Sequence, residues 1–135
     1  MLDYSTITEA RTHLKEAYDR ASRGTAVRLG RDQDRLVLTN QDRLRRYFAS
    51  TVSPRLRVGQ DDGRWIASMD ARPFVAEGAD AESAIDELTT ELREYAEDYE
   101  EHYSGASNHQ NDWGLVQLVQ LSTDAELAEW VRSEA

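Results

Sequence analysis

The sequence predicts an α+β protein built from two small domains within 135 residues. Residues 1–50 predict the order β-α-β-β-α, and residues 55–135 predict β-β-α-β with a C-terminal helix. Two observations lead to this prediction. Apolar residues recur at helical spacing in some stretches and in alternation in others, and the two halves carry charge of opposite sign. Between them, the small, polar, proline-ended residues 49–54 predict a linker.

The first predicted helix follows a short strand over residues 2–5. Thr6 and Glu9 form the T-x-x-E pattern of a capping box, in which two amide donors at a helix start are satisfied reciprocally. Gly24 stands where this helix should end, because glycine adopts the left-handed conformation of a C-terminal cap. One apolar face is predicted from helical spacing: Ala10, Leu14, Ala17, Tyr18 and Ala21.

Two short runs after Gly24, residues 26–30 and 35–39, predict the strands of a hairpin, with residues 31–34 as its loop. Asn40 is a suitable cap for a second helix. The apolar residues of that helix are Leu44, Tyr47 and Phe48.

The first half resembles the DNA-binding domain of the prevent-host-death antitoxins, the Phd/YefM family. The matching features are the T-I-T-E-A-R start of the first helix at residues 6–11, Leu14, Gly24, the basic Arg31, the apolar pair Leu36 and Leu38, and the D-R-L-R sequence at residues 42–45. The hairpin loop departs from the family, which tends to carry a glycine there. The resemblance implies a homodimer that binds operator DNA. By this resemblance Arg11 and Arg31 contact DNA, with Arg28 and Lys15 as further candidates.

The second half begins with two predicted strands joined by a turn at Gln60-Asp61-Asp62-Gly63, because D-G is a strong hairpin signal. Residues 75–78 are expected to bridge to a long amphipathic helix capped by Asp80. A loop over residues 104–114, a strand over 115–121 and a helix over 122–135 complete the prediction. The apolar stripe of the long helix is Ala81, Ala84, Ile85, Leu88, Leu92, Tyr95, Ala96, Tyr99 and Tyr103.

The second half is similar to the HicB antitoxin domain. The residues that match are D-D-G-R-W-I-A at 61–67 and the segment 75–88, where Gly78 and Ala84 fit the family pattern and Asp80 and Ser83 depart from it. The resemblance implies a partial RNase H-like fold that binds a toxin. Candidates for the toxin contact are the acidic helix, the 115–121 segment and the C-terminal tail, represented by Tyr99, Leu118 and Trp130. For Trp130, packing into the domain's own core is an equal alternative.

Charge is divided unequally along the chain. Residues 1–57 hold 12 Lys+Arg against 7 Asp+Glu, a balance of +5, whereas residues 58–135 hold 4 against 19, a balance of −15. A basic half can neutralise DNA phosphates, and an acidic half suits a basic protein. The alternative is that the acidic helices are solvated faces. With the two resemblances, the charge predicts an antitoxin that neutralises a ribonuclease toxin and represses its own operon.

Several classes of function are disfavoured. The chain has no cysteine, which excludes disulfides and thiolate metal sites. No nucleophile motif, phosphate loop or metal-spaced histidine pair is present, so we expect neither enzyme activity nor a cofactor. His13, His102 and His109 are expected at the surface. A magnesium nuclease site of Asp61, Asp62, Asp70 and Glu94 is a disfavoured alternative.

The location follows from two further absences in the sequence. No apolar run approaches the ~20 residues that span a bilayer, and the N-terminus does not have the pattern of a secretory signal. We therefore expect a cytoplasmic protein without a membrane partner. A ligand-sensing transcriptional regulator without a toxin partner remains the alternative function.

Overall fold

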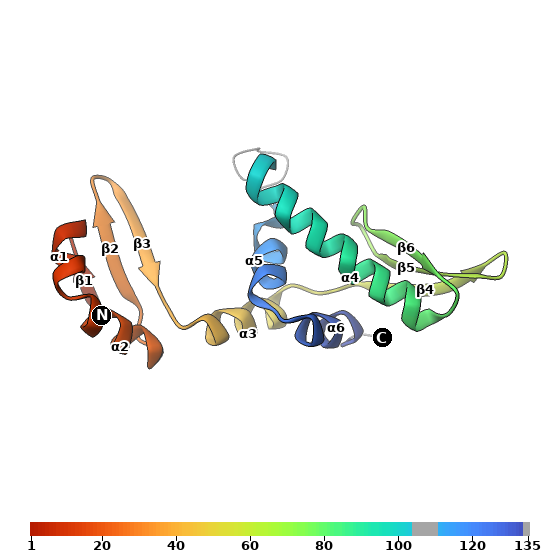
Figure 1. Cartoon of the computed structure of the whole chain (residues 1–135), viewed down its shortest axis with the longest axis horizontal. Helices are drawn as coiled ribbons and strands as arrows, with labels where there is room; N and C mark the ends of the chain where they lie inside the picture. The colour runs from red at the N-terminus through yellow and green to blue at the C-terminus, as the bar shows by residue number, and fades with distance from the viewer. Residues whose placement is uncertain (104–110, 134–135) are drawn as a thin grey trace. The chain divides into compact units, whose positions relative to one another are not determined.

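The computed structural model describes residues 1–103 and 111–133. The chain divides into two compact units, Met1–Arg46 and Tyr47–Ala135 (Figure 1). The division falls inside helix α3 (Gln41–Thr51). The linker predicted at residues 49–54 therefore begins later than expected. Ser50 and Thr51 lie in the last turn of α3, where their hydroxyls donate to the carbonyl of Tyr47 at 2.8 and 2.9 Å.

The first unit contains a three-stranded sheet in the order β1 (Leu2–Tyr4), β2 (Val27–Arg31), β3 (Asp34–Leu38). Strand β1 is parallel to β2, and β2 is antiparallel to β3. The predicted hairpin is confirmed, but its loop is shorter than expected. Only Asp32 and Gln33 lie between the strands. The Arg35 guanidinium donates to the carbonyls of Asp32 and Asp34, at 3.1 and 2.9 Å, which stabilises the turn.

The predicted single helix is two helices, α1 (Ile7–Thr12) and α2 (Leu14–Ser22), separated at His13. Thr6 caps α1 and accepts from the backbone N–H of Glu9 at 3.1 Å. The reciprocal half of the predicted capping box is not formed, because the Glu9 carboxylate accepts from the Ser5 hydroxyl, at 3.3 Å, instead of from the Thr6 N–H. Gly24 follows α2 at φ 91°. The N–H of Thr25 reaches back to the carbonyl of Arg20 at 3.1 Å. This is the Schellman arrangement that a C-terminal glycine favours.

The core of the first unit is small. Two residues from the predicted helical stripe, Leu14 and Tyr18, are exposed instead of buried. The apolar residues of β3 are exposed as well. The hydrophobic stripe of α2 therefore covers only the part of the sheet nearest β1 and β2. The buried cluster is Tyr4, Ala17, Ala21 and Val27, with Leu2, Ala10 and Leu29 packed against it.

The second unit contains an antiparallel sheet in the order β4 (Leu56–Asp61), β5 (Arg64–Met69), β6 (Val75–Gly78). The predicted hairpin turn is confirmed: Asp62 and Gly63 have φ of 52° and 79°, the pair of positive values of a type I′ turn. The bridge expected at residues 75–78 is strand β6. It pairs with β5, and Ala76 and Gly78 alternate inward with the exposed Val75 and Glu77.

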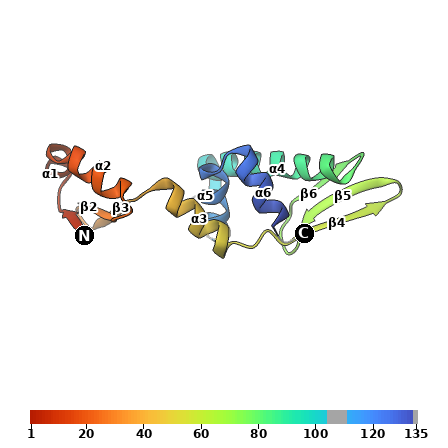
Figure 2. The same ribbon diagram turned by 90° about the horizontal axis from the view of Figure 1, so that it is seen from below.

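Helix α4 (Ala81–Asp98) lies along one face of this sheet and continues into the π-helical turn η1 (Tyr99–Tyr103) (Figures 1 and 2). Asp80 caps α4, accepting from the N–H of Ser83 at 2.7 Å. A Cβ on Gly78 would lie 2.4 Å from the backbone nitrogen of Ala84. Only glycine therefore lets β6 approach α4 so closely. The buried stripe of α4 is Ala84, Ile85, Leu88, Leu92 and Ala96.

The strand predicted at residues 115–121 is wrong. This segment lies within helix α5 (Trp113–Leu121), which precedes helix α6 (Asp124–Arg132). An apolar run of this length suits a buried strand or a buried helix. The spacing of Gln117 and Gln120 fits a helix, where both lie on one side. The α+β class is unchanged, but the expected β-β-α-β order is not. The loop predicted at 104–114, with His109, lies mostly outside the described residues.

Candidate functional site

The predicted DNA-contacting residues of the first unit differ in their surroundings. Arg11, in the last turn of α1, and Arg31, at the end of β2, are both exposed. Neither forms an ion pair with any residue that the structure describes. Arg28 is half-buried and lies 3.3 Å from Asp3. The ammonium of Lys15 lies 2.9 Å from Asp19. Arg11 and Arg31 are therefore the two members of the predicted set without an ion pair among the described residues, and Arg31 lies opposite Asp34 in the β2–β3 ladder.

An open groove of about 500 Å³ runs along α2 and adds basic residues that the sequence analysis missed. Arg20 lies 3.8 Å from Glu16, and Arg23 follows at the end of the helix. The spacing of Glu16, Arg20 and Arg23 on one helical face was the signal available in the sequence. The groove is lined by Thr12, His13, Lys15, Glu16, Asp19, Arg20 and Arg23.

The ion pairs in this groove are weak. Side chains four residues apart on an exposed helix contribute about 0.3–0.5 kcal/mol per pair. The Lys15–Asp19 pair has exposed fractions of 92% and 44%. A phosphate oxygen can therefore compete for such a lysine at little cost to the fold. The groove could bind polyanions despite its two acids.

The three residues predicted for the toxin contact lie in the core of the second unit. Tyr99, Leu118 and Trp130 are 4%, 0% and 5% exposed. The indole Nε1–H of Trp130 donates to the carbonyl of Val52 at 2.9 Å. In the folded chain these side chains are not available to a partner. Trp130 packs within its own domain, which was the alternative prediction for this residue.

The exposed surface of α4 is acidic. Glu82 and Asp86 face Arg132 of α6, at 2.6 and 3.7 Å. The remaining acids of the helix have no cationic partner among residues 1–103 and 111–133. Like charges at helical spacing repel one another, so α4 forms because its apolar stripe packs on the sheet. The uncompensated acids are Glu87, Glu91, Glu94, Glu97 and Asp98.

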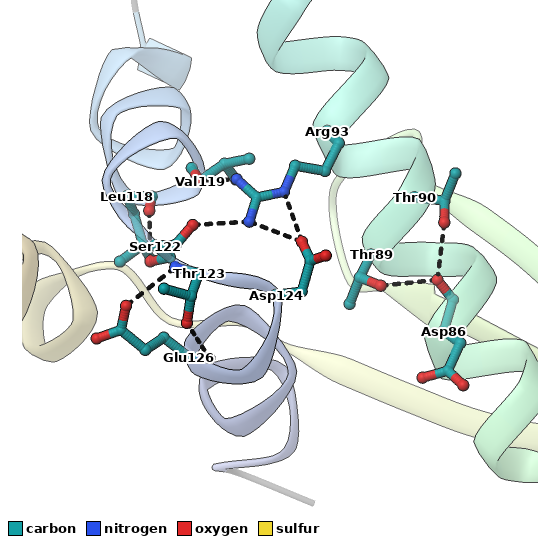
Figure 3. Close-up of polar contacts among 10 residues, drawn as sticks. All are labelled: Asp86, Thr89, Thr90, Arg93, Leu118, Val119, Ser122, Thr123, Asp124 and Glu126. Carbon is teal, nitrogen blue, oxygen red and sulfur yellow. Dashed lines mark hydrogen bonds and ion pairs between the residues drawn. The ribbon is translucent and has the colours of Figure 1, made fainter.

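Arg93, the one basic residue of α4, does not neutralise this surface. Its guanidinium reaches the carbonyls of Val119 and Ser122 at the end of α5, and the carboxylate of Asp124 at 2.9 Å (Figure 3). Cations at a helix C-terminus compensate the last carbonyls. Arg93 therefore fixes the α5–α6 junction. Beside it, a groove of about 370 Å³ is lined by Asp86, Thr89, Thr90, Arg93, Glu94, Glu97, Asp124 and Ala128.

The disfavoured magnesium site is not assembled. Asp61 and Asp62 lie at the tip of the β4–β5 hairpin and Asp70 follows β5, while Glu94 projects from the exposed side of α4. The part of the chain that the structure describes holds no group of three His, Asp or Glu residues able to bind a metal ion. Within the same residues, no helix is both long and apolar enough to cross a membrane.

Residues 1–130 match the model of the PHD-like family, described as "Antitoxin of toxin-antitoxin, RelE / RelB, TA system". The chain is therefore an antitoxin of a toxin–antitoxin system, with a cognate toxin as its partner. It belongs to the PHD-like family. This family is not enzymatic, which confirms the prediction that the chain is not an enzyme. The prediction of an antitoxin is confirmed at the level of the family.

The fold has been observed in a solved structure. A crystal structure from Syntrophomonas wolfei subsp. wolfei, described as the antitoxin part of a toxin/antitoxin system, superimposes with a TM-score of 0.81. The two sequences are 22% identical, and the match covers 96% of each chain. The two chains thus share one fold from end to end. A comparison with curated proteins gave no match.

Proposed function

We propose that this antitoxin forms a homodimer that binds its own operator DNA through the first unit and neutralises a basic ribonuclease toxin through the second. The observation that carries the proposal is the division of charge between the units. Met1–Arg46 holds 10 Lys+Arg and 7 Asp+Glu, a balance of +3, whereas residues 47–135 hold 6 and 19, a balance of −13. Two surfaces of opposite sign suit two partners of opposite charge.

The DNA contact is supported by exposed cations on several elements of the first unit. Arg11 and Arg31 have no ion pair among the described residues, and Lys15, Arg20 and Arg23 line one groove. Each cation that contacts a phosphate releases condensed counterions, so such binding weakens steeply as salt rises. These residues supply affinity for the backbone. Base contacts would be needed for operator recognition.

Homodimerisation is supported by the apolar surface that the first unit leaves uncovered. Leu36, Val37 and Leu38 are consecutive and all exposed on the edge strand β3. Leu14 and Tyr18 of α2 are exposed as well. An exposed apolar edge strand is a surface at which another chain can pair. A second copy would bury these side chains and place two DNA-contacting sets in one particle.

The toxin contact is supported by the uncompensated acids of α4. A ribonuclease binds a polyanion, so its active surface carries cations that an acidic helix can meet. Arg93 is turned toward α5 and α6, and Arg132 pairs with Glu82 and Asp86. The other five acids of α4 therefore have no cationic partner among the described residues. We therefore assign the toxin contact to Glu87, Glu91, Glu94, Glu97 and Asp98, in place of the three buried residues.

A HicB-like origin of the second unit has partial support. The β4–β5 hairpin and the capped start of α4 follow the expected order, whereas α5 stands in place of the expected strand. The ligand-sensing alternative gains no support from the two grooves described above. Both grooves are open and lined mainly by charged and polar side chains.

The operator contact is tested by titrating the full chain against the DNA upstream of its own gene at several salt concentrations. Arg11→Ala and Arg31→Ala should each weaken binding and lower the salt slope by about one counterion. Arg64→Ala, an exposed arginine of the second unit, is the matched control. Parental binding by both variants would reject the proposed contacts, as would an equal loss in the control.

A further inference from the structure

Strand β4 is an open edge of the second unit's sheet. The strand order places it beside β5 alone, and five of its six residues are exposed. Helix α4 packs on β5 and β6, and the tip of the β4–β5 hairpin extends past it in both views (Figures 1 and 2). One side of β4 is therefore available for further strand pairing.

The hairpin geometry shows which backbone groups are available. A two-residue turn makes its flanking residues, Asp61 and Arg64, a hydrogen-bonded pair. Hydrogen-bonded and non-hydrogen-bonded pairs alternate along an antiparallel ladder. Gly59 and Arg57 therefore also bond to β5. The residues between them direct N–H and C=O groups away from the sheet: Leu56, Val58 and Gln60.

The other edge strand of the sheet, β6, has fewer backbone groups available for pairing. Strand β6 has four residues, of which only Val75 and Glu77 direct backbone groups outward. Natural sheets protect their edges with short strands, charged side chains, prolines, bulges or inward-pointing charges. Strand β4 has six residues in continuous register with β5 and contains no proline. Its protecting feature is a pair of charged residues of opposite sign on the face away from α4: Asp61, and Arg57, which lies 3.7 Å from Asp70 of the same chain.

We propose that β4 pairs with β4 of a second copy of this chain, antiparallel about a two-fold axis at Gly59. This pairing joins two three-stranded sheets into one of six strands. In this register Val58 exchanges both backbone hydrogen bonds with the second copy's Gln60. Arg57 lies opposite the second copy's Asp61, and the symmetry repeats both contacts. The edge is thus complementary to itself in charge and in hydrogen bonding.

Charge favours a second copy over the toxin at this edge. Residues 56–78, which form the sheet, hold three arginines against four acids. Residues 81–133 hold two arginines against thirteen acids. A basic toxin would be drawn to the helices. Two acidic chains approach each other with least repulsion at the nearly neutral sheet. This pairing is independent of any dimer formed through the first unit and would link such dimers together.

A single cysteine tests this register, because the chain contains none of its own. At the two-fold axis Gly59 faces its own copy as a non-hydrogen-bonded pair, with Cα atoms about 4.5 Å apart. That separation permits a disulfide. A Cβ on Gly59 would meet no atom within 4 Å, so Gly59→Cys should fold. Val75→Cys, on the exposed start of β6, is the matched control.

The full-length variants are incubated with oxidised glutathione and the disulfide-linked dimer is measured without reductant. Gly59→Cys should cross-link several-fold faster than Val75→Cys. Arg57→Asp and Asp61→Arg, added singly, should each slow the cross-linking. Together they exchange the two charges and should restore the rate. Equal rates in the two cysteine variants, or a double variant as slow as its singles, would overturn the proposal.

Hydrogen exchange of the unmodified full chain gives a second readout that requires no substitution. The Val58 and Gln60 amides point out of the isolated sheet and exchange quickly unless the edge is paired. Pairing with a second copy predicts that their protection increases with the concentration of the chain alone. Protection that arises only when the toxin is added would assign the edge to the toxin and overturn the pairing of two copies.

Discussion

The indole of Trp130 donates a 2.9 Å hydrogen bond to the carbonyl of Val52, which ties α6 to the segment that follows α3. The ring itself is 5% exposed. A buried tryptophan usually finds a partner for its N–H in this way. Trp130 therefore stabilises the second unit. A substitution at Trp130 should reduce toxin binding by destabilising that unit.

Trp130→Phe keeps most of the packing and removes the hydrogen bond, leaving the Val52 carbonyl without this donor. We expect the free energy of unfolding to fall by about 1–3 kcal/mol. Trp130→Ala also opens a cavity and should cost about 3–5 kcal/mol. Urea unfolding of the full chain measures both. A phenylalanine variant with parental stability that no longer bound toxin would show a direct contact instead.

Arg93→Lys should destabilise the second unit, because a lysine cannot replace a guanidinium that spans two carbonyls and the Asp124 carboxylate. We expect a loss of about 1–3 kcal/mol in urea unfolding. The neighbouring Glu94→Gln is the control, with an expected change within about 0.5 kcal/mol. Equal stability of the two variants would contradict the role given to Arg93.

Gly78→Ala should be costly for a steric reason. Its Cβ would lie 2.4 Å from the Ala84 nitrogen, so β6 or the start of α4 must move. Overpacking of this kind costs about 1–3 kcal/mol. Gly59→Ala, where a Cβ meets nothing within 4 Å, serves as the control and should not destabilise. Thermal or urea unfolding compares the two, and similar effects would argue against the close approach.

Acid should weaken the cap of α4. The backbone hydrogen bond from Ser83, followed by a side-chain hydrogen bond from the same residue, lowers the pKa of Asp80 below its ordinary 3.8. The folded state thus favours the carboxylate, and this contribution is present above pH 3.8 and lost as pH falls through the folded pKa. Asp80→Asn keeps a capping oxygen but should remove this part of the pH dependence. The free energies of unfolding of the parent chain and of Asp80→Asn, measured from neutral pH downward, should show this difference. Identical pH slopes for the two chains would refute the role of the Asp80 carboxylate.

The acidic surface of α4 predicts a charge-dependent toxin complex. Glu94→Lys combined with Glu97→Lys should weaken toxin binding on the order of tenfold, mainly through slower association. The effect should shrink at high salt. Glu129→Lys, on the exposed side of α6, is the control. If Glu129→Lys weakened toxin binding as much as the α4 double variant, or if the α4 double variant had no effect, the toxin contact would lie elsewhere.

Elements with a local chemical cause were predictable from the sequence. The Thr6 cap, the Gly24 termination, the Asp62-Gly63 turn and the Asp80 cap each depend on residues a few positions apart. The stripe of α4 was predictable because helical periodicity over five turns has few alternatives. Arg11 and Arg31 were selected through the family resemblance and not through periodicity, and both are exposed, as a contact with DNA requires.

The remaining features depend on contacts distant in sequence. The run at residues 115–121 suits either a strand or a helix until its neighbours are known. Leu14 and Tyr18 have the spacing of a buried face, yet the three-stranded sheet of the first unit is too small to cover them. Tyr99 and Trp130 are aromatic residues of the kind that anchors interfaces, and only the tertiary fold shows that they are internal.

The proposal that the second unit neutralises a toxin is tested most directly by co-expression with the gene next to this one on the chromosome. The neighbour should arrest growth when expressed alone. This chain should restore growth and co-purify with the neighbour, and the Glu94→Lys and Glu97→Lys double variant should do both less well. A neighbour that is harmless alone and does not co-purify would contradict a toxin encoded at this locus. If the double variant restored growth as well as the parent chain, the acidic α4 surface would not be the toxin contact.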